Sequence, residues 1–282
     1  MAWRPNCCPN KDTAKMVRTR SRAEADDSPG EAFQPISVKP PSSNPWAFRL
    51  RCVVDLQLAT IVKHLRPALG SLDGKVLDVG AGQSPWRSWL PERVHYFGLD
   101  IANAAEFGMS ESVRDVTYYD GGSMPFADGT FDAVLCVEVM EHASDPELLV
   151  SEMFRVLKPG GTLLLTVPWS ARLHHLPHDY HRFTRNRLRA LLSGHGFADI
   201  RIAERGSDVG AIANKLTVLS LRLFSPGQGW RLVFTMPFGV ITGLLAAAFV
   251  CAAHAADRLG WGAAEDPLGY FLQATRSIRR PD

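Results

Sequence analysis

Apolar residues along the chain follow two alternating patterns. Short apolar runs typical of buried strands cover Lys75–Val79, Tyr96–Asp100, Val116–Tyr119, Ala133–Val137, Thr162–Val167, Ile200–Arg205 and Leu268–Thr275. Apolar residues spaced three and four apart predict helices over Trp46–Leu69, Pro146–Leu157 and Arg185–Ser193, with the turn Lys158–Gly161 after the second helix. Alternating strands and helices are typical of a parallel sheet covered on both faces. We therefore expect an α/β fold with a doubly wound, seven-stranded sheet.

Two segments depart from this alternation. Residues 1–45 are polar, charged and rich in proline. Such a segment buries too little apolar area to offset its ordering entropy, so we expect it to be disordered. The run Leu232–Ala256 has no Asp, Glu, Lys or Arg and is long enough to cross a bilayer. We expect one sheet domain formed by residues 46–206 and 262–282, interrupted by an apolar helical insertion at 207–261.

The position of the insertion limits how it can meet a membrane. If Leu268–Thr275 closes the sheet, both flanks of the apolar run lie on the same side of any bilayer. A re-entrant or interfacial hairpin satisfies this condition, whereas a single span does not. Trp230 and Trp261 flank the run, as aromatic residues do at membrane interfaces. A helical lid packed on the sheet domain is one alternative interpretation, and a spanning helix with an unpaired C-terminal tail is another.

Composition narrows the class of partner and the compartment. The chain has 282 residues, 46% of them hydrophobic, with 31 basic and 29 acidic side chains. Without a strongly basic field, we expect no nucleic-acid partner. The five cysteines are scattered and show no repeated C-x-x-C spacing, which fits neither a disulfide framework nor a zinc site. We expect a reducing environment on the cytoplasmic side, with the protein associated with the membrane.

The loop after the first predicted strand is the first candidate ligand site. Gly80 and Gly82 allow the backbone to approach a ligand closely. Pro85 occupies the position of the third glycine in a dinucleotide-binding loop. The carboxylate of Asp78 would repel a pyrophosphate but attract the ammonium of an amino acid. A nicotinamide-dependent oxidoreductase is therefore disfavoured.

Two further carboxylates follow at the ends of the next strands. Asp100 closes the second strand and can accept hydrogen bonds from both hydroxyls of a ribose. Asp120 closes the third strand, where an adenine amino group could be bound. The three loops together favour an adenosine ligand that also carries an amino-acid moiety.

Four motifs, in order, carry a resemblance to a known family. They are Leu77-Asp78-Val79-Gly80-Ala81-Gly82, Met124-Pro125-Phe126-Ala127-Asp128-Gly129-Thr130-Phe131-Asp132, Glu138-Val139-Met140-Glu141-His142 and Arg155-Val156-Leu157-Lys158-Pro159-Gly160-Gly161. With them the chain resembles the class I S-adenosylmethionine-dependent methyltransferases, which have a Rossmann-like sheet. The resemblance implies S-adenosylmethionine as cofactor, with Asp78, Gly80 and Gly82 at its methionine part, Asp100 and Ile101 at the ribose, Asp120 and Gly121 at the adenine, and Glu138 as a further contact.

The segment after the fifth predicted strand is the candidate acceptor side. Four histidines, an aspartate and a tyrosine lie within residues 174–181. Ligands bind at the carboxyl ends of strands in such sheets, so we expect this segment to form a lid over the acceptor. His175 or His178 could remove a proton from an acceptor hydroxyl. The alternative is structural: these side chains cap the next helix and pair with Arg182.

Glu138-x-x-Glu141-His142 offers a second interpretation. It resembles the metal-binding motif of small-RNA 2′-O-methyltransferases and of ubiquinone-pathway O-methyltransferases. Carboxylates and an imidazole could bind a divalent ion that activates a hydroxyl. Many relatives with a similar Glu-His pair need no metal, so we expect no metal here and a packing or capping role for His142.

The sequence as a whole predicts a methyltransferase that acts on a small, hydrophobic or lipid-like acceptor, more readily at oxygen than at carbon. The apolar insertion is the feature that favours such an acceptor. Two alternatives stay open: a soluble O- or N-methyltransferase of a sugar or secondary metabolite, and a non-catalytic, cofactor-binding membrane scaffold.

Overall fold

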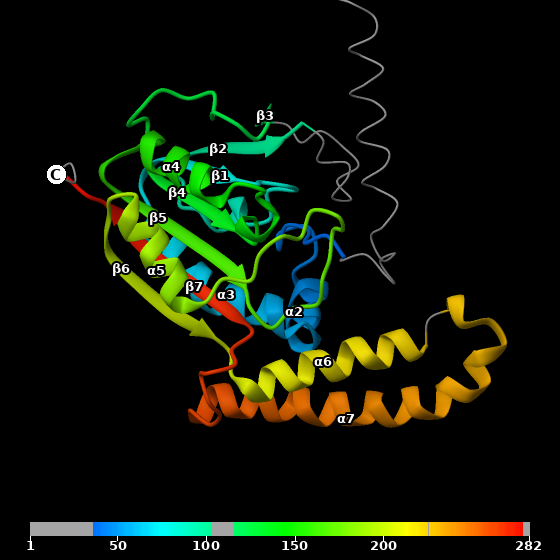
Figure 1. The fold of residues 1–282 in the computed structure, drawn as a ribbon. Coiled ribbons are helices and arrows are strands. Elements are labelled where there is room, and N and C mark those ends of the chain that lie inside the picture. Colours follow the sequence, from blue (N-terminus) through cyan, green and yellow to red (C-terminus); the bar gives the residue numbers. More distant parts are fainter. Residues whose placement is uncertain (1–35, 103–114, 225, 279–282) are drawn as a thin grey trace, which may run out of the picture.

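The computed structural model describes residues 36–102, 115–224 and 226–278, so the prediction of disorder for residues 1–45 lies outside the described residues over 1–35. Seven strands form one sheet in the order β3-β2-β1-β4-β5-β7-β6 (Figure 1). Their bounds are β1 Gly74–Val79, β2 Val94–Ile101, β3 Val116–Tyr119, β4 Phe131–Val137, β5 Leu157–Pro168, β6 Phe197–Arg205 and β7 Gly269–Arg276. The doubly wound, seven-stranded fold is thus confirmed.

The expectation of a wholly parallel sheet is wrong for the last strand. β7 lies between β5 and β6 and is antiparallel to both. The cause is where the chain re-enters the sheet: the Leu268 N–H donates to the Arg205 carbonyl at 2.8 Å. Because β7 starts beside the end of β6, it must run in the opposite direction.

The helices are α2 Pro45–Val54, α3 Leu56–Leu69, α4 Pro146–Val156, α5 Arg185–Gly194, α6 Asp208–Leu223 and α7 Leu232–Leu259, with short 3₁₀ turns η2 Arg87–Trp89, η4 Met140–His142 and η5 Pro226–Arg231. The single helix expected over Trp46–Leu69 is two helices. Asp55 separates them, since its backbone is non-helical and its side chain accepts a hydrogen bond from the Leu58 N–H at 3.1 Å. An aspartate in this position caps α3.

The turn expected at Lys158–Gly161 lies inside β5. The pairing register with β4 shifts between Phe131 and Ala133, and Gly160 has a left-handed φ of 79°. Lys158 Nζ reaches Asp132 Oδ1 at 2.6 Å across this irregularity. The two glycines therefore form an irregular start to the strand rather than a separate turn.

Alternation along the strands divides the core between the two faces of the sheet. Leu77, Val134 and Leu163 belong to the cluster that contains residues of α4 and α5. Val76 and Leu135, on the opposite face, pack with α3. Alternate residues of each strand are thus buried on opposite faces of the sheet. Because helices cover both faces, ligands can reach the sheet only at the ends of its strands.

Helices α6 and α7 form an antiparallel hairpin that projects from the sheet (Figure 1). Its base is anchored by a small cluster, Leu56, Ala213, Ala253 and Leu268, and by the Lys63–Asp257 ion pair at 2.5 Å. Small residues bring the two helices close, because a Cβ on Gly239 would lie 3.0 Å from the Phe224 ring. The insertion is therefore a firmly joined helical pair.

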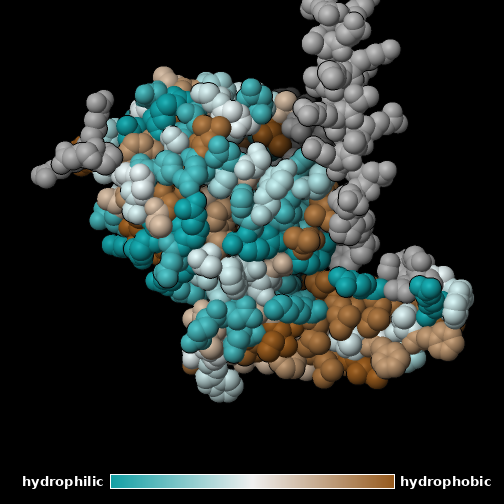
Figure 2. All heavy atoms as spheres, in the orientation of Figure 1, coloured by the Kyte–Doolittle hydropathy of each residue, from teal (hydrophilic) through white to brown (hydrophobic). Residues whose placement is uncertain are grey.

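The hairpin exposes large apolar side chains. They include Val233, Phe234, Phe238, Val240, Ile241 and Leu244, and the window of highest hydropathy in α7 is only 11% buried. Figure 2 shows this apolar surface along the hairpin, next to a largely hydrophilic sheet domain. By length and composition, the helix Gly229–Leu259 is the one helix in the described residues that could cross a membrane. A packed lid, the alternative for this insertion, would bury this surface.

Candidate active site

The loop after β1 has a tightly constrained backbone. Gly80 has a φ of 70°, and a Cβ there would lie 2.3 Å from Val139 Cγ2. Gly82 and Ser84 also have left-handed φ values of 51° and 52°. Such a φ is uncommon for serine, and residues of this kind concentrate at binding sites. Glycine at position 80 is required by the loop after β4, whose Val139 packs against it.

Asp78 is almost fully buried, with 1% of its surface exposed. Its Oδ2 accepts a hydrogen bond from the Tyr96 hydroxyl at 2.9 Å, and that hydroxyl lies 3.0 Å from Ser84 Oγ. Burial raises the pKa of Asp78 to about 7, helped by the nearby Asp100, although the Tyr96 hydrogen bond opposes the rise. A cationic ligand group beside this carboxylate would therefore be bound strongly.

Asp100, near the end of β2, links this strand to the loop after β1 through hydrogen bonds. Its Oδ2 accepts from the Gly82 N–H at 2.9 Å and its Oδ1 from the Ile101 N–H at 2.8 Å. Burial raises the pKa of this carboxyl, while the two backbone hydrogen bonds act in the opposite direction. Each oxygen retains a second lone pair, so the geometry leaves room to accept a hydroxyl from a ligand.

Gly121 lies beside Ile101, because a Cβ on Gly121 would be 3.9 Å from Ile101 Cγ2. Asp120 is exposed and its Oδ1 accepts from the Gly122 N–H at 2.9 Å, which forms a tight local turn. The structure thus brings Asp78, Gly80, Gly82, Asp100, Ile101 and Gly121 to one edge of the sheet, with Asp120 at its rim. Carboxylates and glycines at adjoining strand ends suit a ligand that carries both a cation and a ribose.

Two of the sequence motifs are joined by one ion-pair network. Arg155 donates to the carbonyls of Met124 and Phe126 at 2.9 and 2.8 Å, and to both oxygens of Glu152. Glu152 in turn accepts from the Met124 N–H at 2.6 Å. The Met124-Pro125-Phe126 loop is therefore fixed by α4, a structural reason for these residues that the sequence did not reveal.

Glu138 lies next to the glycine loop but is engaged elsewhere. Its φ is 55°, and its Oε1 accepts from Arg205 Nη2 at 2.8 Å. The Arg205 side chain has no exposed surface and also donates to the carbonyls of Val167 and Tyr270, at 3.1 and 3.3 Å. The buried guanidinium fixes Glu138 beside the end of β5.

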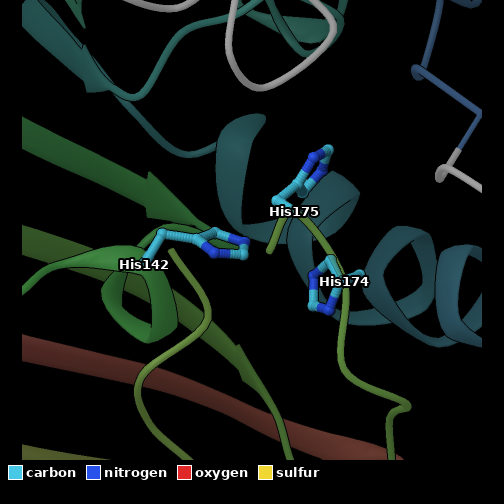
Figure 3. A group of neighbouring side chains, drawn as sticks. All are labelled: His142, His174 and His175. Atoms are coloured by element: carbon cyan, nitrogen blue, oxygen red, sulfur yellow. The ribbon is translucent and has the colours of Figure 1, made fainter. Parts of the chain in front are cut away.

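The histidine-rich segment folds back against η4 (Figure 3). His175 gathers with His142 and His174, whereas His178 is turned toward Tyr180, with its Nδ1 2.9 Å from the hydroxyl. The backbone of Glu141 accepts from the N–H groups of Tyr180 and His181 at 2.8 and 3.2 Å. The segment thus covers the carboxyl end of β4, and it places the two expected bases in different surroundings.

Asp179 and Arg182 stabilise the conformation of the histidine-rich segment. The two form a paired contact at 2.6 and 2.8 Å. Burial alone would raise the pKa of Asp179, but hydrogen bonds from Arg182 and His174 lower it well below its ordinary range. The structural interpretation of the segment is correct for this pair, and Thr184 caps α5 by accepting from the Arg187 N–H at 3.2 Å. His175 and His178 do not take part in that capping bond.

Glu141 and His142 both lie in the interior. Burial raises the pKa of Glu141 well above its ordinary value, and the neighbouring Glu138 adds to this. Burial lowers the pKa of His142 to about 4, and the adjacent His174 and His175 lower it further. Burial therefore favours the uncharged form of the Glu141 carboxyl, and His142 is a neutral imidazole at neutral pH.

Sequence reasoning missed two residues of this region. Tyr96 lies within a strand, where a hydroxyl gives no local sign of its partner. Arg205 was counted as the end of a strand, yet it is fully buried and pairs with Glu138, 67 positions earlier. The only signal in the sequence was a charged residue at the end of a predicted buried strand.

Comparisons with known proteins found a matching family model and several similar sequences. Residues 77–165 match a family model described as a methyltransferase domain. A ubiquinone biosynthesis O-methyltransferase of Idiomarina loihiensis is 33% identical over 164 residues, which cover 54% of this chain and 65% of that protein. Squalene methyltransferase 1 of Botryococcus braunii is 31% identical over 125 residues, 43% of this chain and 32% of its own length. The chain spans from a third to just under two thirds of these relatives.

Among solved structures, the crystal structure of the [4+2]-cyclase SpnF resembles this fold with a TM-score of 0.50. The similarity covers 88% of this chain and 100% of that one, at 19% identity. At this identity the likeness concerns the fold alone.

Proposed function

We propose, on the premise that this chain belongs to the class I S-adenosylmethionine-dependent methyltransferases, that it methylates a lipid-like acceptor at the membrane surface, at an oxygen atom. The observation that carries the proposal is the exposed apolar hairpin α6–α7 attached to the sheet domain. Relatives named as ubiquinone-biosynthesis and squalene methyltransferases support a lipid-like acceptor. The hairpin, residues 207–261, would act as the membrane-contacting unit, and 46–206 with 262–282 as the catalytic domain.

The residues at the ends of β1 to β3 would bind the cofactor. Asp78, Gly80 and Gly82 would contact its methionine part, since Asp78 offers a buried carboxylate to the ammonium. Asp100 and Ile101 would meet the ribose, and Asp120 with Gly121 the adenine. Glu138 lies next to the glycine loop, and its pairing with Arg205 would keep the loop after β4 in place. When bound, S-adenosylmethionine supplies a methyl group on a sulfonium for in-line transfer.

The affinity for the cofactor should depend on pH through Asp78. Because the pKa of its carboxyl is about 7 in the free protein, the group is ionised at pH 8 and largely protonated at pH 6. Only the ionised form attracts the ammonium, so the dissociation constant should rise about tenfold between pH 8 and pH 6. Calorimetric titrations of the wild type and of Asp78→Asn test this. The Asp78→Asn variant should bind the cofactor weakly, with an affinity that depends little on pH. If the affinities of the wild type and the variant changed with pH in parallel, Asp78 would not be the group that binds the ammonium.

The lid would provide the proton acceptor for a hydroxyl substrate. An imidazole suits the role, because its pKa lies near neutrality and the leaving thioether needs no acid. His175 and His178 are the two candidates, and both lie in the segment that covers the carboxyl end of β4. The rest of the work is alignment and exclusion of water, to which the lid, fixed by Asp179 and Arg182, would contribute.

The hairpin would lie in the plane of the interface rather than cross the bilayer, on the cytoplasmic side. Both of its ends return to the sheet, so a single span would separate β7 from its neighbours. Lys215 is exposed on α6, and Arg231 lies at the tip, where a deep position in the hydrocarbon would be costly. Trp230 and Trp261, 74% and 64% exposed, flank α7 at its two ends. These features are typical of an interfacial helix.

Removing apolar side chains from α7 should release the protein from membranes. The triple variant Val233→Ser, Phe238→Ser and Leu244→Ser alters only exposed positions, so the fold should be kept. Burying one such side chain in the membrane favours binding by about 1.5–3 kcal/mol. The fraction of the variant bound to membranes, relative to the fraction in solution, should therefore fall at least about tenfold. Co-sedimentation with phosphatidylcholine–phosphatidylglycerol vesicles measures it, with Leu148→Ser on α4 as the matched control. Equal sedimentation of both variants would refute membrane contact through this face.

A further inference from the structure

Three histidines from two separate segments converge beside η4 (Figure 3). His142 belongs to η4, and His174 and His175 to the lid. One ring nitrogen of each lies within 4.8 Å of those of the other two. In tetrahedral zinc sites the ligand nitrogens lie about 3.4 Å apart, so the cluster needs a closure of about 1.5 Å.

Hydrogen bonds to carbonyl and carboxylate oxygens indicate which nitrogen carries the proton in two of the rings. The Nδ1 of His142 lies 2.7 Å from the His178 carbonyl, which can only accept, so Nδ1 carries the proton. The Nδ1 of His174 faces the Arg172 carbonyl at 3.1 Å and Asp179 Oδ2 at 3.2 Å, which are also acceptors. In both rings the lone pair is therefore on Nε2. A metal-binding histidine has this arrangement, with the second nitrogen donating to a carbonyl or carboxylate.

A buried carboxyl group without a hydrogen-bond partner lies beside the cluster. Glu141 has no exposed side-chain surface, and neither of its oxygens has a hydrogen-bond partner among the described residues. Its Oε1 lies 3.7 Å from His142 Nε2. A buried, unsatisfied carboxyl is costly unless a positive group lies near it. An ion at the imidazole nitrogens would provide that group.

We infer that His142, His174 and His175 bind a divalent transition-metal ion of the zinc type, with Glu141 as its neighbouring charge. Imidazole nitrogen is a preferred ligand of such ions, and three protein ligands leave a fourth position for an oxygen. Glu138 is not part of this ligand set, because its carboxylate pairs with Arg205. The metal site is thus formed by the lid and η4, and not by the Glu138-x-x-Glu141-His142 triad.

The site has a consequence that rests on the proposed function. A ligated His175 cannot also accept a proton, so His178 is left as the base. The ion would bind an acceptor oxygen at its open position, on the acceptor side of the pocket. Metal binding itself is measured without cofactor or acceptor, so its failure is distinguishable from failure of the methyltransferase proposal.

The test is binding of Zn²⁺ and Co²⁺ to the untagged, metal-stripped full chain. We expect one equivalent of Zn²⁺ per chain by calorimetry and, with Co²⁺, visible absorption of a tetrahedral site. His174→Ala and His142→Gln should each weaken binding at least tenfold, with circular dichroism confirming that they fold. His95→Ala is the matched control, because His95 is exposed near the amino end of β2. Absence of stoichiometric binding by the wild type, or equal binding by all variants, would overturn the inference.

Discussion

Replacing Arg205 by methionine should destabilise the protein by about 3–5 kcal/mol, the range found when one partner of a buried ion pair is removed. The guanidinium is fully buried, and it donates to Glu138 and to the carbonyls of Val167 and Tyr270. Methionine fills much of the volume but leaves these acceptors without a donor. Urea unfolding of the purified protein, followed by circular dichroism, measures the loss.

The control is Arg201→Met on the same strand. Arg201 is exposed, so its replacement should change the free energy of unfolding by no more than about 0.5 kcal/mol. Adding Glu138→Gln to Arg205→Met should restore part of the stability, because the partly buried carboxylate is then no longer left charged and unpaired. A loss below about 1 kcal/mol for Arg205→Met would show that the pair does not hold β6 to the end of β5.

Replacing Asp100 by alanine should weaken binding of S-adenosylmethionine by about 1–3 kcal/mol, or five- to more than a hundredfold. The carboxylate would accept the ribose hydroxyls, and it also positions the glycine loop through the Gly82 N–H at 2.9 Å. Both contributions are lost together in the variant. Titration calorimetry at pH 8 measures the dissociation constant while Asp78 is ionised.

Asp73→Ala provides the comparison for this measurement. Asp73 is exposed just before β1, at the opposite edge of the sheet, and should leave the affinity unchanged. Asp100→Asn separates charge from geometry, since the amide oxygen can still accept the Gly82 N–H. An unaltered affinity in Asp100→Ala would remove this residue from the cofactor site.

Much of the fold could be predicted from the sequence, because periodicity alone marks which segments are buried on both sides. The strand positions agree with the structure to within a few residues for β1, β4 and β7. The direction of β7 could not be read from its apolar run, since direction depends on where the chain re-enters the sheet. The break at Asp55 is a side-chain capping effect inside an otherwise helical spacing.

Some residues of the candidate site could also be predicted from the sequence, and others could not. Asp78, Gly82 and Asp100 were predictable together, because the carboxyl ends of adjacent parallel strands meet at one edge. The pairing of Glu138 with Arg205 was not, as it joins residues far apart in sequence. The histidine cluster joins η4 to the lid, so only the folded chain shows that His175 lies with His142 while His178 lies apart.

The central claim is that the protein transfers a methyl group to a lipid-like acceptor. The most direct measurement incubates it with methyl-labelled S-adenosylmethionine and extracts of host cells, beside an Asp78→Ala control, and partitions the products between organic and aqueous phases. The account predicts label in the organic phase with the wild type and none with the control. Label confined to the aqueous phase, or equal organic label with both proteins, would contradict it.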